Sequence, residues 1–265
     1  MPHHPAGLGE SLGDILATTS NLYTGTNVYF VHHTGSDSNA GTSREAPKAT
    51  VGSAVTAGGA GSIIVCMDGH TETLTAAVVL AAGMVIVGGG QSSSKPTVKF
   101  TNNQAAAAAF TMSGTGCELR NIWLEEELQA NSSTRITMSG LFCLLKNCYI
   151  ESNGNSDAYD VTISAAYVRI VGNTFISTAS AASARPVGAL TGTGVTYFQV
   201  EDNVFDGGSY GYSDYAYKLV TSVIGHKGTG NSFLRGADMT KPAIGTDDGY
   251  FAVPTTSGAA QIEGW

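Results

Sequence analysis

The apolar positions along the chain form short clusters that recur at a nearly constant interval. The segment FTMSG at 110–114 returns as ITMSG at 136–140. Within one copy, apolar runs at 110–112, 117–119 and 122–124 are separated by Gly or Asn. Short runs bounded by turn residues are typical of β-strands, whereas a helical repeat needs runs of about ten residues. The pattern therefore predicts three short strands in each repeat.

An Asn-x-aromatic motif marks the same repeat five times, at intervals of about 26–30 residues, a period in the range of solenoid repeats. The Asn residues are Asn121, Asn147, Asn173, Asn203 and Asn231, and the aromatic residues are Trp123, Tyr149, Phe175, Phe205 and Phe233. A repeat of this length built from three strands is typical of one coil of a parallel β-helix, in which equivalent residues lie about 4.8 Å apart. We therefore expect one Asn ladder at a turn and one stack of aromatic rings beside it in the core.

These features predict an all-β fold, a right-handed single-stranded parallel β-helix of about six or seven coils at about 27 residues per coil. The coils are expected to occupy residues 61–235. Residues 27–60 are expected to cap the first coil, since the end of a solenoid exposes unpaired strand edges. Residues 1–26 are then an N-terminal arm, and residues 236–265 are a C-terminal cap or tail.

Both ends of the chain, and one tyrosine-rich stretch at 210–217, are predicted to contact a partner. The arm contains a short predicted helix whose apolar face cannot be buried within the arm itself. Tyr is favoured both in protein interfaces and in contacts with carbohydrate. The expected contact residues are Leu12, Ile15, Leu16, Tyr210, Tyr212, Tyr215 and Trp265. The alternatives are frayed termini, and tyrosine rings that only cover a turn of the column.

Composition and charge mainly exclude classes of function. Charged residues make up 13% of the chain, about half the typical share, and the net charge is −8. An acidic chain of this kind is not expected to bind nucleic acid or an anionic membrane surface, and it lacks the apolar run of about 20 residues that a membrane span needs. Four Cys without a secretion signal favour buried free thiols, although stacking of Cys117 over Cys143 would also allow a disulfide.

Several segments resemble a known superfamily. VYFV at 28–31, GSDSNAGTS at 35–43 and APKAT at 46–50 resemble the entry to right-handed parallel β-helix proteins of the pectate-lyase-like superfamily, and IIVCMDGHTETL at 63–74 resembles their first coil. More narrowly, residues 27–235 resemble the short β-helix proteins of tailed bacteriophage virions. The resemblance implies a homotrimer, made in the host cytoplasm and built into the virion, with the major capsid protein or another virion protein as its partner.

Two glutamates are the candidates for catalysis. Glu125 and Glu151 each follow a ladder Asn by four positions, so we expect them to stack on adjacent coils. Carboxyl groups about 5–5.5 Å apart are what a retaining glycosidase needs. The alternative is that they are solvated turn residues, with residues 125–127 forming a charged rim. Further acidic residues on neighbouring turns are Asp157, Asp160, Asp202 and Asp206. The Ca²⁺ site and the Arg or Lys base of the superfamily's pectate lyases have no match in this sequence, which counts against a lyase.

Other polar motifs fit structural roles better than chemical ones. His70 and Glu72 lack a third ligand nearby in sequence, so a capped turn is expected there. Asp37 and Asn39 fit Asx turns without an ion. The three glycines at 88–90 lack the Lys-Ser/Thr of a phosphate loop. We therefore expect no metal and no cofactor.

The sequence thus favours a non-enzymatic virion protein, a trimeric β-helix that decorates or cements the phage capsid. The alternative is a receptor-binding tail fibre or spike that binds, and in its enzymatic form cleaves, host surface polysaccharide. Glu125 and Glu151 or the tyrosines at 210–217 would then carry the interaction. A cellular enzyme acting on glycans is a third reading, because this fold hosts enzymes and inert structural proteins alike.

Overall fold

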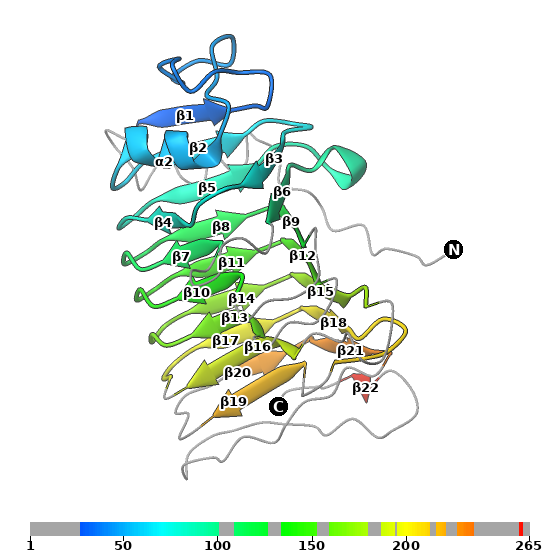
Figure 1. Cartoon of the computed structure of the whole chain (residues 1–265). Helices are drawn as coiled ribbons and strands as arrows, with labels where there is room; N and C mark the ends of the chain where they lie inside the picture. The colour runs from blue at the N-terminus through cyan, green and yellow to red at the C-terminus, as the bar shows by residue number, and fades with distance from the viewer. Residues whose placement is uncertain are drawn as a thin grey trace.

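In the computed structural model, the chain winds into a column of parallel strands arranged in three sheets (Figure 1). This confirms the expected all-β parallel β-helix. The structure describes residues 27–100, 109–126, 134–152, 159–179, 187–193, 195–212, 216–220, 227–235 and 260–261. Within these residues no helix has the length and apolar character to cross a membrane.

Each sheet stacks strands from successive coils, and the coils from β2 to β19 contribute one strand to each of the three sheets. Sheet A contains β1 (Val28–Val31), β2 (Ile63–Cys66), β5 (Val85–Gly88), β8 (Glu118–Arg120), β11 (Leu144–Lys146), β14 (Arg169–Val171), β17 (Gln199–Glu201) and β20 (Lys227–Thr229). Sheet B contains β3 (Thr71–Leu74), β6 (Thr97–Phe100), β9 (Trp123–Glu126), β12 (Tyr149–Ser152), β15 (Thr174–Ser177), β18 (Val204–Asp206), β21 (Ser232–Leu234) and the antiparallel β22 (Ala260–Gln261). Sheet C contains β4 (Val78–Leu80), β7 (Phe110–Met112), β10 (Ile136–Met138), β13 (Tyr159–Ile163), β16 (Gly188–Thr193) and β19 (Tyr217–Val220).

The chain runs from sheet A to sheet B to sheet C in every coil, which gives the column three corners. We call them the A–B, B–C and C–A corners. Sheet C has six strands and therefore five steps between neighbours, so the fully three-sided column makes about five turns. The expected six or seven coils were slightly too many. The average of about 27 residues per coil holds, because Ile63 to Lys227 spans 164 residues in six steps along sheet A; the coils of β1 and β20 at the two ends have no described strand in sheet C.

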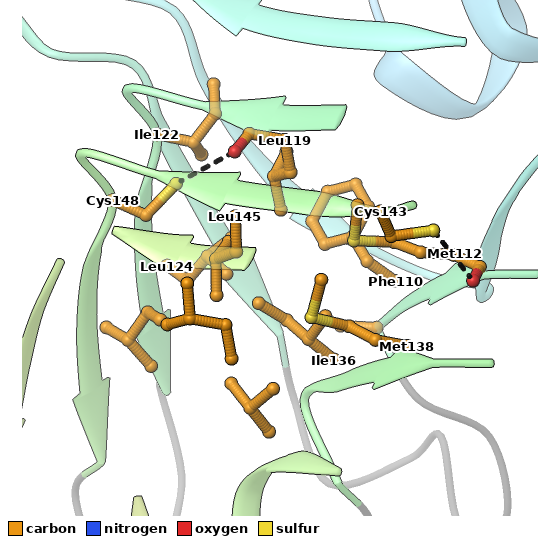
Figure 2. Packing of buried hydrophobic residues seen from close by; sticks show 14 of the residues in the cluster. Phe110, Met112, Leu119, Ile122, Leu124, Ile136, Met138, Cys143, Leu145 and Cys148 are labelled. Carbon is orange, nitrogen blue, oxygen red and sulfur yellow. Dashed lines mark hydrogen bonds between the residues drawn. The ribbon is translucent and has the colours of Figure 1, made fainter. Parts of the chain in front are cut away.

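The core lies inside the column, because alternate residues of each short strand point inward. Figure 2 shows Leu119 from sheet A, Leu124 from sheet B and Met112 from sheet C directed into one interior. All three are fully buried. The four cysteines of the chain are buried and free, as expected for thiols in a core, and Cys117 lies beside Cys143 on the next coil.

One helix, α2 (Val51–Gly58), packs against β1, β2 and β4 near the end of the column (Figure 1). The Thr50 hydroxyl accepts a hydrogen bond from the Ser53 backbone N–H at 3.2 Å, and this caps the helix N-terminus. A short 3₁₀ turn, η1 (Ser92–Ser94), lies between β5 and β6.

The five Asn residues of the repeat do not form one ladder, which corrects the expectation from their spacing. Strand pairing aligns Arg120 with Lys146 and Lys146 with Val171. Asn121 and Asn147 are therefore followed by Gly172, not by Asn173, at the A–B corner. The residues at this corner all have a positive φ, and they are Asn121, Asn147, Gly172, Asp202 and Gly230.

Asn173, Asn203 and Asn231 form a separate, buried ladder one residue further along the chain. The side-chain amide of Asn173 donates to Oδ1 of Asn203 at 3.0 Å, and that of Asn203 donates to Oδ1 of Asn231 at 3.0 Å. Each Oδ1 also accepts the backbone N–H of the residue one coil before, at 2.9–3.0 Å. The ladder thereby satisfies polar groups that burial would otherwise leave unpaired.

The aromatic residues of the repeat divide into an outer and an inner group at the same point of the chain, between Tyr149 and Phe175. Trp123 and Tyr149 begin their strands and point outward, with ring centroids 5.1 Å apart at 66°. Phe175, Phe205 and Phe233 occupy the second strand position and are buried, with neighbouring centroids 5.0 Å apart. A shift of one residue moves a side chain to the other face of a strand, so the expected single stack became an outer pair and an inner stack of three.

Candidate functional site

The outer face of sheet B gathers the candidate catalytic residues on consecutive coils. In β9 and β12 the first and third residues are partly exposed and the second and fourth are buried. This alternation directs Trp123, Glu125, Tyr149 and Glu151 outward. Lys99 of β6 lies one coil earlier, in register with Glu125. These five side chains thus share the outer face of three neighbouring strands, β6, β9 and β12.

The structure places Glu125 and Glu151 in register on adjacent strands, as the sequence predicted. Paired residues of parallel strands lie about 4.8 Å apart. The ammonium of Lys99 is 3.2 Å from Oε1 of Glu125. Glu125 therefore forms an ion pair with a lysine of the preceding coil.

Glu151 has a different environment. Burial raises the pKa of its carboxyl group, and the charge of Glu125 raises it further. The nearby Thr178 and Trp123 side chains and the charge of Lys99 oppose this rise without cancelling it. The Glu151 carboxyl group therefore holds a proton more readily than an ordinary glutamate. A carboxyl group with a raised pKa is suited to act as a general acid.

The aromatic rings of Trp123 and Tyr149 flank this pair. Burial raises the pKa of the Tyr149 hydroxyl, and the carboxylates of Glu151 and Asp206 add to the effect. Nε of Arg235 donates to Oδ1 of Asp206 at 2.7 Å, so an ion pair borders the face on its C-terminal side. Aromatic side chains beside carboxyl groups offer an apolar surface together with hydrogen-bonding partners, which a sugar ring requires.

The tyrosine-rich stretch forms less of a surface than expected. Tyr210 is exposed, but Tyr212 and Tyr217 are buried. Tyr212 therefore does not present its ring to a partner in this structure. The predicted contact residues that lie outside the described residues are Leu12, Ile15, Leu16, Tyr215 and Trp265, and Asp157 also lies outside them.

The polar motifs near the N-terminal end have structural partners. Asp37 accepts hydrogen bonds from the backbone of Ala49 and Thr50 at 3.0 and 2.9 Å, and the Lys48 ammonium donates to the Asp37 carbonyl oxygen at 3.0 Å. The Glu72 carboxylate accepts the N–H of Val51, the first residue of α2, at 2.9 Å. The residues described here include no group of three or more His, Cys, Asp or Glu side chains placed to hold a metal ion.

A buried charged cluster at the B–C corner escaped the sequence analysis. Arg135 is almost completely buried and pairs with Glu126, and its Nε lies 3.4 Å from Oδ1 of Asp160. The Ser152 hydroxyl donates to the same oxygen at 2.6 Å. Burial raises the pKa of Asp160 to about 7, although Arg135 and Ser152 act against the rise. The sequence did contain a signal for this cluster. Side chains alternate between the two faces of a strand, so Glu126 points inward when Glu125 points outward.

Comparisons with known proteins assign this chain to no family. No protein-family model and no curated protein matches this chain. Among solved structures, a rhamnogalacturonan lyase is similar, with a TM-score of 0.49 and 14% sequence identity. The similarity covers 83% of this chain and 65% of that structure, so the chain spans less than two thirds of the lyase.

Proposed function

We propose that this protein is a receptor-binding fibre or spike protein of a tailed bacteriophage, which binds host surface polysaccharide on the outer face of sheet B and hydrolyses it there. One observation carries the proposal: Glu125, which pairs with Lys99, and Glu151, whose pKa is raised, are stacked on adjacent strands beside Trp123 and Tyr149. The phage setting rests on the sequence resemblance alone.

In the proposed reaction, Glu151 is the general acid. Its raised pKa keeps a proton available, and it donates that proton to the glycosidic oxygen as the bond to the leaving sugar breaks. The Glu125 carboxylate attacks the anomeric carbon and forms a covalent glycosyl intermediate, since the spacing of adjacent strands, about 4.8 Å, suits the retaining geometry. Glu151, now deprotonated, takes a proton from the water that releases the sugar.

Trp123 and Tyr149 would hold the polysaccharide in place. Their rings lie on the same two strands as the carboxyl groups, two positions before each of them. A pyranose ring resting against an aromatic side chain there would bring its neighbouring glycosidic bond towards the carboxyl pair. Binding and cleavage would therefore depend on different residues of one face.

The test measures reducing ends released from purified capsular and lipopolysaccharide glycans. Wild type is compared with Glu125→Gln and Glu151→Gln, each expected to lose at least about 100-fold of the rate, since either change removes one member of the acid–base pair. Glu118→Gln is the matched control, because Glu118 pairs with Arg120 on sheet A, away from the proposed site. Trp123→Ala should weaken glycan binding. Release that does not depend on either glutamate would refute the proposed reaction.

A second candidate is the non-enzymatic role, a decoration or cement protein bound to the major capsid protein. The observation that favours it is a group of large apolar side chains left exposed at the C–A corner, which includes Leu141 and Phe142. Exposed apolar patches on soluble proteins commonly mark contacts with other proteins. Occupancy of capsids by the wild-type chain, with no glycan released, would favour this candidate over the first.

A further inference from the structure

Three aromatic side chains project from consecutive turns at the C–A corner. Phe142, Tyr167 and Tyr197 lie on successive coils, with ring centroids 4.8 and 5.3 Å apart and neighbouring ring planes tilted by 15° and 10°. Their exposed fractions are 57, 44 and 52%. We call these three residues the aromatic edge. With Leu141, they account for four of the six large hydrophobic side chains that are exposed among the described residues.

The backbone at the aromatic edge is one that bulky residues normally avoid. Phe142, Tyr167 and Tyr197 have φ values of 59°, 59° and 52°, in the left-handed region. The two preceding coils place Gly83 and Gly116 at the same turn position, with φ values of 68° and 71°. Glycine is the residue that this conformation favours. Three coils therefore accept strained aromatic residues where two others use glycine, and strain of this kind tends to persist where a contact depends on it.

The three turns that carry the edge contain no acidic group. These turns, at 139–142, 164–167 and 195–197, contain no charged residue of either sign. Next to them, the outward positions of sheet C stack threonines in register, and these are Thr111, Thr137, Thr162 and Thr191. On the sheet A side, Nε of Arg169 donates to Oε1 of Gln199 at 2.9 Å, which provides a polar rim. An aromatic centre with few charges and a polar rim is the composition of a protein interface.

We propose that the aromatic edge and the threonine column of sheet C form the surface through which a second copy of this chain binds. The chain carries a net charge of −8, so two copies repel each other except where acidic groups are absent. The aromatic edge and the threonine column meet that condition over several coils. This inference concerns a different corner from the proposed polysaccharide site, so either can fail without the other.

Ring geometry favours a protein partner over a sugar at this edge. Tyr167 has a stacked ring on each side, so its exposed part is the ring edge. A pyranose needs an uncovered ring face, whereas another protein can pack against ring edges. The rings alone offer roughly 300 Å² of contact if about half of each is free. A stable interface needs about 800 Å² from each partner, which is why the threonine column must take part.

The repeat also constrains the assembly. The aromatic edge runs along the column with one residue on each coil. Two copies therefore make contacts on every coil only when their columns lie side by side. Identical chains joined through one such surface usually form a closed symmetric oligomer. The trimer implied by the sequence resemblance is one such arrangement.

The test compares molecular masses by light scattering after size-exclusion chromatography of the full chain. Wild type is expected at a multiple of 27.2 kDa. The triple variant Phe142→Gly/Tyr167→Gly/Tyr197→Gly is expected at the mass of one chain, with its dissociation constant raised about 100-fold or more, because aromatic residues at the centre of an interface carry much of its affinity. Glycine already occupies this position in two coils, so the variant should keep its circular dichroism spectrum, which shows that it still folds.

Tyr210→Ser is the matched control, because Tyr210 is an exposed tyrosine outside the aromatic edge. It should keep the wild-type mass. Because Tyr210 is also one of the contact residues expected from the sequence, a monomeric Tyr210→Ser variant would assign the interface to residues 210–217 and overturn the proposal. A wild-type chain that is monomeric at all concentrations would overturn the proposal, and so would a triple variant that keeps the wild-type mass. If the monomeric wild type instead binds oligosaccharide or another virion protein and the triple variant does not, the edge serves that partner and the proposal is wrong.

Discussion

The A–B and C–A corners use the same left-handed backbone conformation with opposite kinds of side chain. At the A–B corner the five residues are Asn, Asp or Gly, the types that tolerate this conformation. At the C–A corner two glycines are followed by Phe142, Tyr167 and Tyr197. Backbone preference alone explains the first corner. It does not explain the second, where bulky aromatic rings stack on one another in a backbone conformation that favours glycine.

The two corners also differ in what lies behind them. Directly inside the A–B corner, the ladder of Asn173, Asn203 and Asn231 makes hydrogen bonds both along the column and to the backbone of neighbouring coils. The aromatic edge instead faces outward. We infer that the A–B corner mainly stabilises the column, whereas the C–A corner mainly presents a surface.

The largest expected effect comes from breaking the buried ladder at Asn203. Its amide donates to the Ile170 carbonyl oxygen at 2.9 Å, and its Oδ1 accepts the N–H of Asn173 at 2.9 Å. Asn203→Ala leaves several buried groups unpaired, so the free energy of unfolding should fall by roughly 3–5 kcal/mol, measured by urea denaturation. Asn121→Gly removes the amide's hydrogen bonds to the Gly88 and Gly90 carbonyl oxygens without straining the positive φ of the corner, so it should cost only about 1–2 kcal/mol. Equal losses in the two variants would contradict the distinction between the ladder and the corner.

The second-largest expected effect comes from the charged cluster at the B–C corner, where stability should depend on pH. Asp160 has a folded pKa of about 7 against an ordinary value of 3.8, so the unfolded chain loses this proton first as the pH rises. Its contribution to stability is therefore fully present below about pH 4 and is lost as the pH rises to about 7. The melting temperature of wild type should fall across this range, and Asp160→Asn should flatten the slope. An unchanged slope in the variant would show that Asp160 is not the titrating group.

The smallest effects come from exchanging residue types between the two corners. Asn147→Tyr places an aromatic ring at the A–B corner and should cost about 1–2 kcal/mol of unfolding free energy, the usual penalty of this backbone conformation. Tyr167→Gly relieves the same penalty but loses its ring contacts, so stability should change by less than about 1 kcal/mol. Thermal unfolding of both variants at a dilution where the chain is monomeric tests this. A large loss in Tyr167→Gly would assign the aromatic edge a structural role.

The sequence was sufficient to predict the stacking of Glu125 over Glu151, because both follow an Asn in coils of equal length. The same counting placed Asn173, Asn203 and Asn231 wrongly in one ladder with Asn121 and Asn147, because the repeat changes length. Phe110 pairs with Ile136, but Ile136 pairs with Val161, which comes one position sooner than an equal step would reach. The shortening lies in the B–C connection, because the step from Ser152 to Val161 is one position shorter than the step from Glu126 to Ile136.

A local signal for this shift was present in the sequence. Asn173, Asn203 and Asn231 follow Gly or Asp, whereas Asn121 and Asn147 follow Arg or Lys. Gly and Asp suit the positive φ of the corner position and occupy it, so the Asn that follows them lies one position further along the chain. The aromatic edge had a similar signal, because the intervals between Phe142, Tyr167 and Tyr197 equal those between the corner residues Asn147, Gly172 and Asp202.

The sequence by itself determined the unit of this protein, a three-strand coil whose short apolar runs can be buried only by stacking on the next copy. The tertiary structure decided which residues of the unit face inward. Side chains alternate between the two faces of a strand, so one residue fewer in a B–C connection reverses every assignment that is made by counting from the previous Asn. Trp123 and Tyr149 therefore lie on the outer face with the glutamates, while Phe175, Phe205 and Phe233 lie in the core.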